Sequence, residues 1–407
     1  MHIGVSTQGF VGWGGGVGFV ENLLFGLVAV PDKVTKITVF VPTPPGQLRR
    51  LSSRLMRATL QPSQAMRHLR GASQDGTPSE TAPELFSRIC SAVVSYDGTQ
   101  TSLRRHCRQL HVDVLLPSMA TLRKFDLPWA GYLFDCQHRY FPQFFQPWEI
   151  ARRDRDFARM LRAASCVIVN AQAAVTDLNS FFPNRTAAIY SLPFSPLMRS
   201  DNISAVVAQT PVAKRRYAAS DNYFIISNQF WIHKDHSTAF KAFALAIEDT
   251  VLRDYKLVCT GALEDYRFPG YFSELKTLLT SLGIEDKVVF TGYIDKLDQL
   301  ALLNGARLML QPTLFEGGPG GGATFDAVAL GVPSILSDLP VNLEINDPIV
   351  TFFKTGCAEA LANALKLTVQ EESTRQEIDV LNQKSNNYAR KLGLSLFDIA
   401  RSCVEMN

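Results

Sequence analysis

Short apolar runs alternate with amphipathic stretches along almost the whole chain. The runs are rich in β-branched and aromatic residues, which favour β-strands, and the stretches between them have helical spacing. Strands that are joined through helices form parallel sheets with right-handed crossovers. The pattern therefore predicts an α/β protein with strands near residues 3–6, 36–41, 112–116, 129–134, 166–170, 223–227, 255–260, 287–292, 307–311 and 333–337.

Ten strands are many for one sheet, and a length of 407 residues suggests two domains. Helical and strand periodicity is lost between residues 191 and 220, where prolines, serines and polar residues predict a linker rather than an element. We therefore expect one doubly wound, Rossmann-like domain over residues 1–195, a linker over 196–220, and a second such domain over 221–387. The last amphipathic pattern, residues 388–404, has no strand after it and needs a surface to dock on.

Composition narrows the class of protein. The hydrophobic content of 46% excludes a disordered chain, and no apolar stretch approaches the roughly 18 residues of a membrane span. The first residues lack the basic start and apolar middle of a secretory signal, so we expect a cytoplasmic protein. The seven cysteines show neither a C-x-x-C pair nor disulfide-like spacing, and we expect reduced thiols.

The charges balance overall but not locally. With 41 basic and 38 acidic residues the net charge is +3, which gives no reason to expect a nucleic-acid partner. Residues 33–74 nevertheless hold eight basic residues and no acid, which leaves 33 basic against 38 acidic elsewhere. Residues 46–60 have the pattern of a basic amphipathic helix, which could contact an anionic membrane or a lipid-diphosphate acceptor; a solvated face is an equal alternative.

Ten of the 26 glycines fall in two short windows, residues 12–18 and 317–322. Each window follows a predicted strand and leads into a predicted helix, where free backbone N–H groups and the helix dipole can meet a phosphate. The first window satisfies no register of the dinucleotide motif G-x-G-x-x-G, and a plain flexible loop is its alternative. The second is bracketed by Glu316 and Asp326, so it would offer N–H donors to phosphate and carboxylate acceptors to sugar hydroxyls.

The second window also contains a nucleotide-binding motif of another class. Gly318, Gly320 and Ala323 satisfy G-x-G-x-x-A, with Asp338 twenty residues beyond Gly318, so a nicotinamide-dependent enzyme is an alternative. Against it, residues 312–317 separate the strand from the motif, where the tight turn should be immediate.

Single charged residues at strand ends are further candidates. Lys234 falls in the expected first turn of a helix, where its charge opposes the dipole, which makes it a candidate partner for a bound anion. Asp135 and His138 follow the strand at 129–134, at the edge where open α/β sheets bind ligands, and the histidine could meet a sugar or acceptor hydroxyl. A solvated lysine and a structural loop histidine are the alternatives.

No metal site is expected. His233 and His236 form an H-x-x-H pair without a third ligand of suitable spacing. Asp154 and Asp156 imitate a D-x-D metal motif, but they lie in an arginine-rich helical stretch and are expected to be ion-paired.

Taken together, these motifs resemble the retaining glycosyltransferases of family four, which have the GT-B fold: two Rossmann-like domains that face each other across a cleft. The resemblance spans essentially the whole chain, and it is the order of the motifs that makes it specific. It is carried by the Gly-Gly-Val loop at 15–17, His138, the helix opening with Lys234, the T-G-Y-I turn at 291–294, and T-L-F-E-G-G running into D-A-V-A-L-G-V-P-S-I-L-S-D at 326–338.

The resemblance implies site roles position by position. His138, Lys234 and Glu316 would be catalytic, with Lys234 on the phosphate charge and Glu316 on the donor sugar, and Asp135 would lie on the acceptor side. The donor would be bound by Gly15 and Gly16 at the diphosphate, Gly320, Gly321 and Gly322 at sugar and phosphate, Asp326 at the ribose, Tyr293 and Ile294 at the base, and Asn228.

Two departures from the family pattern accompany the resemblance. The family's two acidic residues are eight positions apart, whereas Glu316 and Asp326 are ten apart, so this loop carries about two extra residues. The family's arginine six residues before the lysine is Asn228 here, which removes half of the cationic phosphate clamp unless an arginine from elsewhere supplies it.

The implied activity is transfer of a sugar, with retention of configuration, from a nucleoside-diphosphate sugar to a hydroxyl of a glycan or lipid-linked acceptor, in glycan or polysaccharide assembly. No metal or other cofactor is required, and the protein would be cytoplasmic or peripheral to the inner face of the membrane. The resemblance also implies that the C-terminal helix, residues 388–407, packs back on the first domain. An NAD(P)-dependent oxidoreductase, a nucleotide-sugar epimerase and a non-catalytic nucleotide-sugar binder of the same fold are the alternatives.

Overall fold

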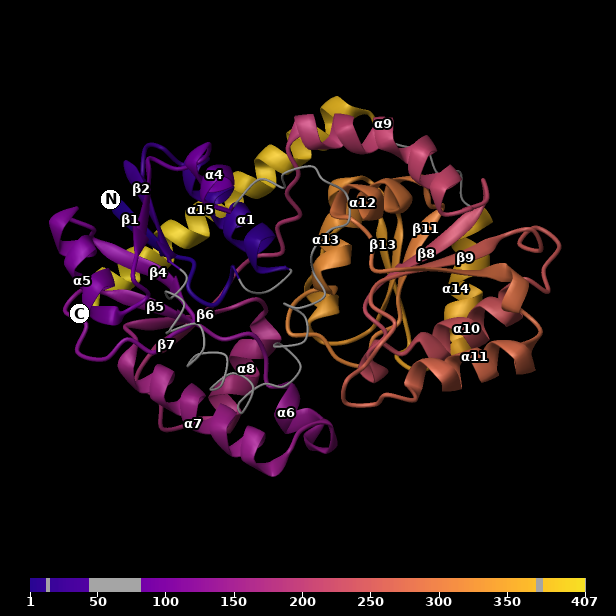
Figure 1. The fold of residues 1–407 in the computed structure, drawn as a ribbon, viewed down its shortest axis with the longest axis horizontal. Helices are drawn as coiled ribbons and strands as arrows, with labels where there is room; N and C mark the ends of the chain where they lie inside the picture. The colour runs from indigo at the N-terminus through magenta and orange to yellow at the C-terminus, as the bar shows by residue number, and fades with distance from the viewer. Residues whose placement is uncertain (12–14, 44–81, 371–375, 407) are drawn as a thin grey trace.

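The computed structural model describes residues 1–11, 15–43, 82–370 and 376–406, and it contains two parallel sheets that lie side by side (Figure 1). The first sheet has the order β3-β2-β1-β4-β5-β6-β7, and the second β10-β9-β8-β11-β12-β13. The first is formed by β1 (His2–Ser6), β2 (Lys36–Pro42), β3 (Ala92–Tyr96), β4 (Val114–Ser118), β5 (Trp129–Tyr132), β6 (Cys166–Val169) and β7 (Ala188–Ser191). The second is formed by β8 (Tyr223–Ser227), β9 (Lys256–Thr260), β10 (Val288–Gly292), β11 (Leu308–Gln311), β12 (Ser334–Ser337) and β13 (Val350–Phe353).

Helices cover both faces of each sheet. Those of the first half are α1 (Gly16–Val28), α4 (Ala82–Ser87), α5 (Gln100–Gln109), α6 (Gln137–Tyr140), α7 (Pro147–Ala163) and α8 (Gln172–Phe181). Those of the second half are α10 (His236–Ala246), α11 (Tyr271–Leu282), α12 (Lys296–Gly305), α13 (Gly321–Ala329) and α14 (Ala358–Gln370). The expected fold class, two doubly wound α/β domains, is confirmed.

The strands are apolar in continuous runs because both of their faces are buried. Ile168 packs into the core on one side of the first sheet, whereas its neighbours Val167 and Val169 pack into the core on the other side. In the second sheet, Phe224 and Ile225 are divided between two cores in the same way. Burial on both faces is the property of parallel sheets that removes the polar alternation of half-exposed strands.

The residues expected to form a linker, 196–220, instead contain helix α9 (Ser200–Arg216). Ile203, Val206 and Ala213 are buried against Leu300 and Leu303 of α12. Because the contacting residues are few and Pro211 lies inside the helix, the sequence carries only a weak helical period there. The connection between the two sheets is therefore a packed helix.

Helix α15 (Ile378–Glu405) contacts both halves of the molecule (Figure 1). Near its start, Leu381 lies in a core of the second half, whereas Leu392 and Leu396 lie in the core of the first half. Its crossing with α1 is close because glycines meet there: a Cβ on Gly393 would lie 2.0 Å from the carbonyl oxygen of Gly26. The two helices can approach this closely only while both positions lack a side chain.

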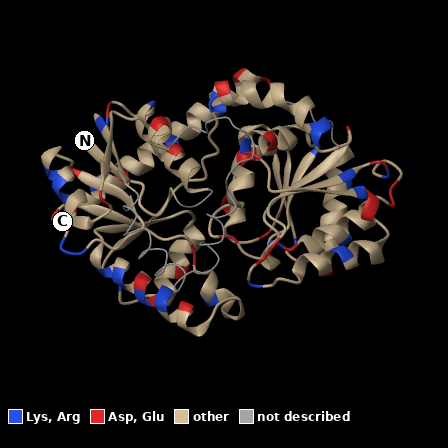
Figure 2. Cartoon of the chain, viewed as in Figure 1, with Lys and Arg blue, Asp and Glu red and all other residues tan. Residues whose placement is uncertain are grey.

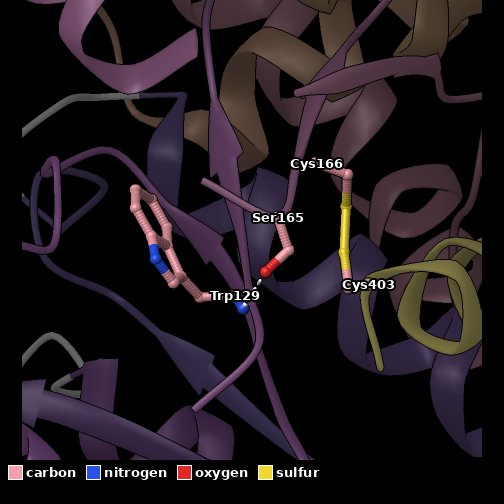
Figure 3. The surroundings of a disulfide bond; sticks show 4 residues. All are labelled: Trp129, Ser165, Cys166 and Cys403. Atoms are coloured by element: carbon pink, nitrogen blue, oxygen red, sulfur yellow. Dashed lines mark hydrogen bonds between the residues drawn. A yellow bond between two sulfur atoms is a disulfide. The ribbon is translucent and has the colours of Figure 1, made fainter. Parts of the chain in front are cut away.

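A disulfide joins Cys166 of β6 to Cys403 of α15, beside Ser165 and Trp129 (Figure 3). The expectation of seven reduced thiols is therefore wrong for this pair. The two cysteines are 237 residues apart in sequence, and their Cα atoms are 5.8 Å apart only because α15 returns to the first sheet. A pairing set by tertiary contact leaves no spacing signal in the sequence.

Within the described residues, no helix has the length and apolar character needed to cross a membrane. Acidic and basic side chains are interspersed over both halves (Figure 2). The basic segment 46–60, whose sequence pattern fits either a membrane contact or a solvated face, lies outside the described residues.

The glycine crossing predicts opposite effects for two helical alanine substitutions. Gly393→Ala should lower the free energy of unfolding by about 1–3 kcal/mol, because the new Cβ overlaps the α1 backbone. Gly18→Ala in α1 is the control: a Cβ there meets nothing within 4 Å, so the better helix propensity should leave stability unchanged or raise it. Urea unfolding of both variants checks this, and equal effects would contradict the close crossing.

The disulfide predicts a thiol count. Alkylation of the unfolded protein, purified without reductant, should modify five cysteines, and all seven after reduction. A peptide map should join Cys166 to Cys403. Seven reactive thiols without reductant would contradict the bond.

Candidate active site

The carboxyl ends of β8, β9, β10 and β11 meet at one edge of the second sheet, and the candidate residues of this half follow those strands. The strand ends are joined to each other: Ser227 shares a hydrogen bond of 3.0 Å with Thr260, and the Gln299 amide of α12 donates to Ser227. This edge is where open α/β sheets bind ligands. The topology thus brings together residues that are far apart in sequence.

At the centre of this edge, Lys234 and Glu316 form an ion pair, with Nζ 2.6 Å from Oε1. Their side chains are only 13% and 9% exposed. The buried Gln311 donates from Nε2 to the same Glu316 oxygen at 3.0 Å, and Asn228 in turn donates to Gln311 Oε1 at 2.7 Å. The Glu316 carboxylate is therefore held from two sides, and Asn228 reaches it through Gln311.

Sequence reasoning named Lys234, Glu316 and Asn228 but missed Gln311. Its position at the end of the strand predicted at 307–311 was the available signal, since a polar residue that ends an apolar run there lies at the edge where ligands bind.

Lys234 does not lie inside a helix. It ends the 3₁₀ turn η2 (Ile232–Lys234), and α10 begins two residues later. Asp235 between them has the left-handed conformation (φ 48°) and caps α10 by accepting from the Thr238 N–H. The His233 carbonyl accepts from the Leu314 N–H at 2.8 Å, which fixes the η2 turn against the loop that carries Glu316.

His233 and His236 flank Lys234 but are buried rather than directed at a ligand. Burial, with the nearby charges of Lys234 and Arg267, lowers the pKa of His233 to about 2. Burial and Lys234 lower the pKa of His236 to about 3, and its ring stacks on Phe230 at 4.0 Å. Both are neutral at pH 7. Within the described residues, no cluster of three or more histidine, cysteine or acidic residues could hold a metal.

The second glycine window ends at the start of α13, next to Glu316. Gly320 and Gly321 both have φ of +65°, a conformation that favours glycine. A Cβ on Gly321 would lie 3.2 Å from Glu316 Oε2, and Gly322 faces open space. The first N–H groups of a helix lack intrahelical partners, so α13 presents donors beside the Glu316 acceptor.

The two preceding glycines contact the first domain. A Cβ on Gly317 would lie 2.7 Å from Cβ of Asp135, and one on Gly318 would lie 2.7 Å from Cβ of Asn170. The adjacent Phe315 ring packs against Tyr140, with centroids 5.5 Å apart. The loop that carries Glu316 therefore lies directly against the carboxyl edge of the first sheet, and of the first-domain candidates Asp135 reaches it.

The residues expected at the base and ribose lie farther along the same edge. Tyr293 is 80% exposed, and Ile294 is packed against the core beneath it. Asp326 of α13 forms an ion pair with Lys296 of α12, with Nζ 2.5 Å from Oδ2. Lys296 was not named from the sequence, and it follows Tyr293 by only three residues.

His138 is fully buried within the first domain. Its Nε2 lies 3.0 Å from Asp154 Oδ1, and its ring packs edge-on against Phe157. Burial lowers the pKa of His138. Nδ1 is also buried, and it has no hydrogen-bond partner within the described residues. Asp154 also pairs with Arg139, as expected for a structural aspartate.

The first glycine window has a structural role at Gly16. A Cβ there would lie 2.1 Å from the Phe10 carbonyl oxygen, so the close approach is to the chain's own backbone. Gly15 is the exposed N-cap residue of α1. Residues 12–14 of the window lie outside the described residues. Gly15 thus marks an accessible helix N-terminus.

Residues 211–385, which include the whole second-sheet site, match the family model described as glycosyl transferases group 1. No curated protein matches the chain.

Similar solved structures cover the whole chain. Sucrose-phosphate synthase from Thermosynechococcus elongatus covers 100% of this chain and 97% of its own, at 15% identity and a TM-score of 0.57. A trehalose-phosphate synthase (UDP-forming) from Burkholderia xenovorans, in complex with glucose-6-phosphate, covers 99% and 100%, at 10% identity and 0.59. Anabaena HepE in complex with UDP and glucose covers 100% and 97%, at 15% identity and 0.51. At such identities the likeness establishes the fold alone.

The buried histidines predict how stability depends on pH. The folded state keeps His236 neutral down to about pH 3, whereas the unfolded chain binds a proton below about pH 6.5. The free energy of unfolding should therefore fall as the pH drops from 6.5, by ~1.4 kcal/mol per pH unit for each such histidine. Urea unfolding between pH 7 and 4 should show a shallower loss in His236→Phe than in the wild type. Parallel curves would contradict a neutral buried His236.

Proposed function

We propose that the protein is a retaining glycosyltransferase. The premise is that the chain has the GT-B fold and that residues 211–385 match the glycosyl transferases group 1 model. Its donor is a nucleoside-diphosphate sugar, bound at the carboxyl edge of the second sheet. Its acceptor is a hydroxyl group of a glycan or lipid-linked glycan, presented from the first sheet. The protein needs no metal or other cofactor and acts in the cytoplasm, in glycan or polysaccharide assembly, although the Cys166–Cys403 disulfide is of a kind more typical of oxidising compartments.

The observation that carries the proposal is the nearly buried pair of Lys234 and Glu316 beside the start of α13. A cation and free N–H groups suit a diphosphate, and a carboxylate suits sugar hydroxyls. Lys234 and Glu316 are adjacent, which suits the adjacent phosphate and sugar groups of one donor.

In the proposed reaction the protein mainly positions the substrates and stabilises charge, and it supplies little covalent chemistry. The bond from the anomeric carbon to the diphosphate breaks, the acceptor oxygen bonds to that carbon on the same face, and the acceptor proton passes to the departing phosphate oxygen. Negative charge grows on the phosphate, where Lys234 and the N–H groups of Gly321 and Gly322 lie ready. One preorganised donor of this kind is worth about 2.7–4 kcal/mol. Glu316 orients the sugar through its hydroxyls.

The remaining donor contacts follow the edge of the sheet. Tyr293, which is exposed, and Ile294 flank the base, and Asp326 exchanges part of its contact with Lys296 for the ribose hydroxyls. Asn228 supports Glu316 through Gln311 instead of contacting phosphate as an arginine would.

On the first domain, Gly15 and Gly16 place the α1 N-terminus toward the diphosphate, Asp135 binds the acceptor, and His138 contacts a sugar through Nδ1. Contact of residues 46–60 with an anionic membrane belongs to the same proposal, because a lipid-linked acceptor would be reached there.

The nicotinamide alternative is disfavoured by the surroundings of its motif. Gly318, the first motif glycine, packs against Asn170 of the first domain rather than facing a free helix N-terminus. Four residues, 312–315, separate the end of β11 from Glu316 and the glycines. A dinucleotide would need a tight turn directly after the strand, with the motif glycines accessible to the ligand.

A donor panel with a charge-neutral variant tests the proposal. UDP-, GDP-, ADP- and dTDP-sugars should be compared with NAD(P) by thermal shift, with UDP-glucose first because HepE and the trehalose-phosphate synthase are described with UDP. One sugar nucleotide should raise the Tm. Glu316→Gln should keep that shift but lower transfer by about 10²-fold or more, the scale of losing one preorganised contact.

The matched control is Glu274→Gln on α11, which should transfer normally. NMR of the product should show the donor's anomeric configuration. Stabilisation by NAD(P) alone, or full transfer by Glu316→Gln, would overturn the assignment, and an inverted product would overturn retention. Donor epimerisation without transfer would favour the epimerase alternative.

A further inference from the structure

Helix α8 of the first domain is capped by a residue of the second domain. Its own N-cap residue, Ala171, makes no side-chain cap hydrogen bond. Instead the N–H groups of Gln172 and Ala173 donate to the two carboxylate oxygens of Glu344, at 2.8 and 2.7 Å. A carboxylate on two free N–H groups at the positive end of a helix is a favourable, charge-assisted contact.

The segment that carries Glu344 is also docked by apolar contacts. Leu339 and Val341, which follow β12, pack into the first-domain core that contains Val169 and Ala171. The start of α8 lies directly after β6, so this contact sits at the carboxyl edge of the first sheet. The cap and the apolar contact form only when the two sheets face each other as they do here.

The same short turn, η4 (Asn342–Glu344), also holds the glycine window. The fully buried Asn342 accepts from the Gly320 N–H at 2.8 Å through Oδ1, and donates to the Ser337 carbonyl at 2.8 Å. Gly320 is the N-cap residue of α13. Asn342 and Glu344 are two residues apart in η4. Asn342 fixes the start of α13, and Glu344 fixes the start of α8.

We propose that Glu344 is a positioning residue that ties closure of the two domains to the geometry of the glycine window. When the first domain docks, α8 gains its cap, η4 is fixed, and Asn342 holds Gly320 beside Glu316. When the domains separate, α8 loses its cap and η4 loses one of its two anchors. The contacts of Gly317 with Asp135 and of Gly318 with Asn170 form at the same interface. The effect on transfer rests on the proposed function, whereas the coupling of cap and closure does not.

Glu344→Ala tests the coupling without any activity. Hydrogen exchange at Gln172 and Ala173 should accelerate by about 2- to 30-fold, the range expected for loss of a helix cap. Small-angle X-ray scattering should give a larger radius of gyration, and high salt should weaken the wild-type contact in the same direction. Glu274→Ala, which removes an acidic residue from the first turn of α11 within the second domain, should change neither reading.

A rescue variant separates capping from closure. Ala171 has the extended backbone of an N-cap residue (φ −152°, ψ 151°), so Ala171→Ser can cap α8 from within the first domain. In Glu344→Ala/Ala171→Ser, slow exchange in α8 should return while the radius of gyration stays enlarged. If the double variant closes again, Glu344 serves only α8, and the proposal fails; an unchanged radius in Glu344→Ala overturns it as well.

The rate of sugar transfer is the last measurement. Glu344→Ala should lower kcat/KM, and the Ala171→Ser rescue should not restore it, whereas Glu344→Gln should lie between wild type and alanine because its amide oxygen still accepts one hydrogen bond. If the protein proves not to transfer sugars, exchange and scattering still decide the coupling. Normal transfer with an enlarged radius would overturn the link to the glycine window.

Discussion

The near-burial of one carboxylate organises the second domain. A charge that is taken out of water is costly unless it is paired and hydrogen-bonded, and Glu316 is only 9% exposed. Lys234 and Gln311 meet this requirement, and each is fixed in turn: Gln311 by Asn228, and the lysine's turn by the backbone contact of His233 with Leu314. Removing Lys234 would leave the carboxylate without its counter-charge, and removing Gln311 would leave it short of a hydrogen bond, which constrains β8, β11 and both of their loops together.

The second constraint is that the site is shared between domains. The glycines at 317 and 318 have room for no side chain because the first domain fills that space, and their neighbours at 320 and 321 need a left-handed backbone. Glycine therefore serves two purposes in one window: close contact between domains in its first half, and helix initiation in its second. Replacing Gly317 or Gly318 would disturb the contact between the domains, whereas replacing Gly320 or Gly321 would disturb the start of α13.

The apolar pattern was sufficient to predict the central strands, because burial on both faces makes them unmistakable. It missed β3, β7 and β13, which lie at sheet edges and are only partly buried, so that their apolar runs are short. Lys234 was predicted because a lysine in an expected first helical turn opposes the helix dipole, and Glu316 because it brackets the second glycine window. Asn342 and Glu344 were not, since their partners come from distant segments and polar residues in loops carry no periodic signal. Gln311 was also missed, although its position at the end of β11 was a signal. The disulfide was missed because only tertiary contact produces it, and helix α9 because its few buried residues and Pro211 leave a weak helical period.

The return of α15 to the first sheet affects the order in which the protein can be made. Domains usually begin to fold in the order of synthesis. Here the core that contains Val20, Leu24 and Leu27 of α1 is completed by Leu392, Leu396 and Ile399, which the ribosome adds only after the whole second sheet. Until then an apolar stripe of α1 has no cover. The first domain therefore emerges first, but its core can be completed only after the second domain has been synthesised.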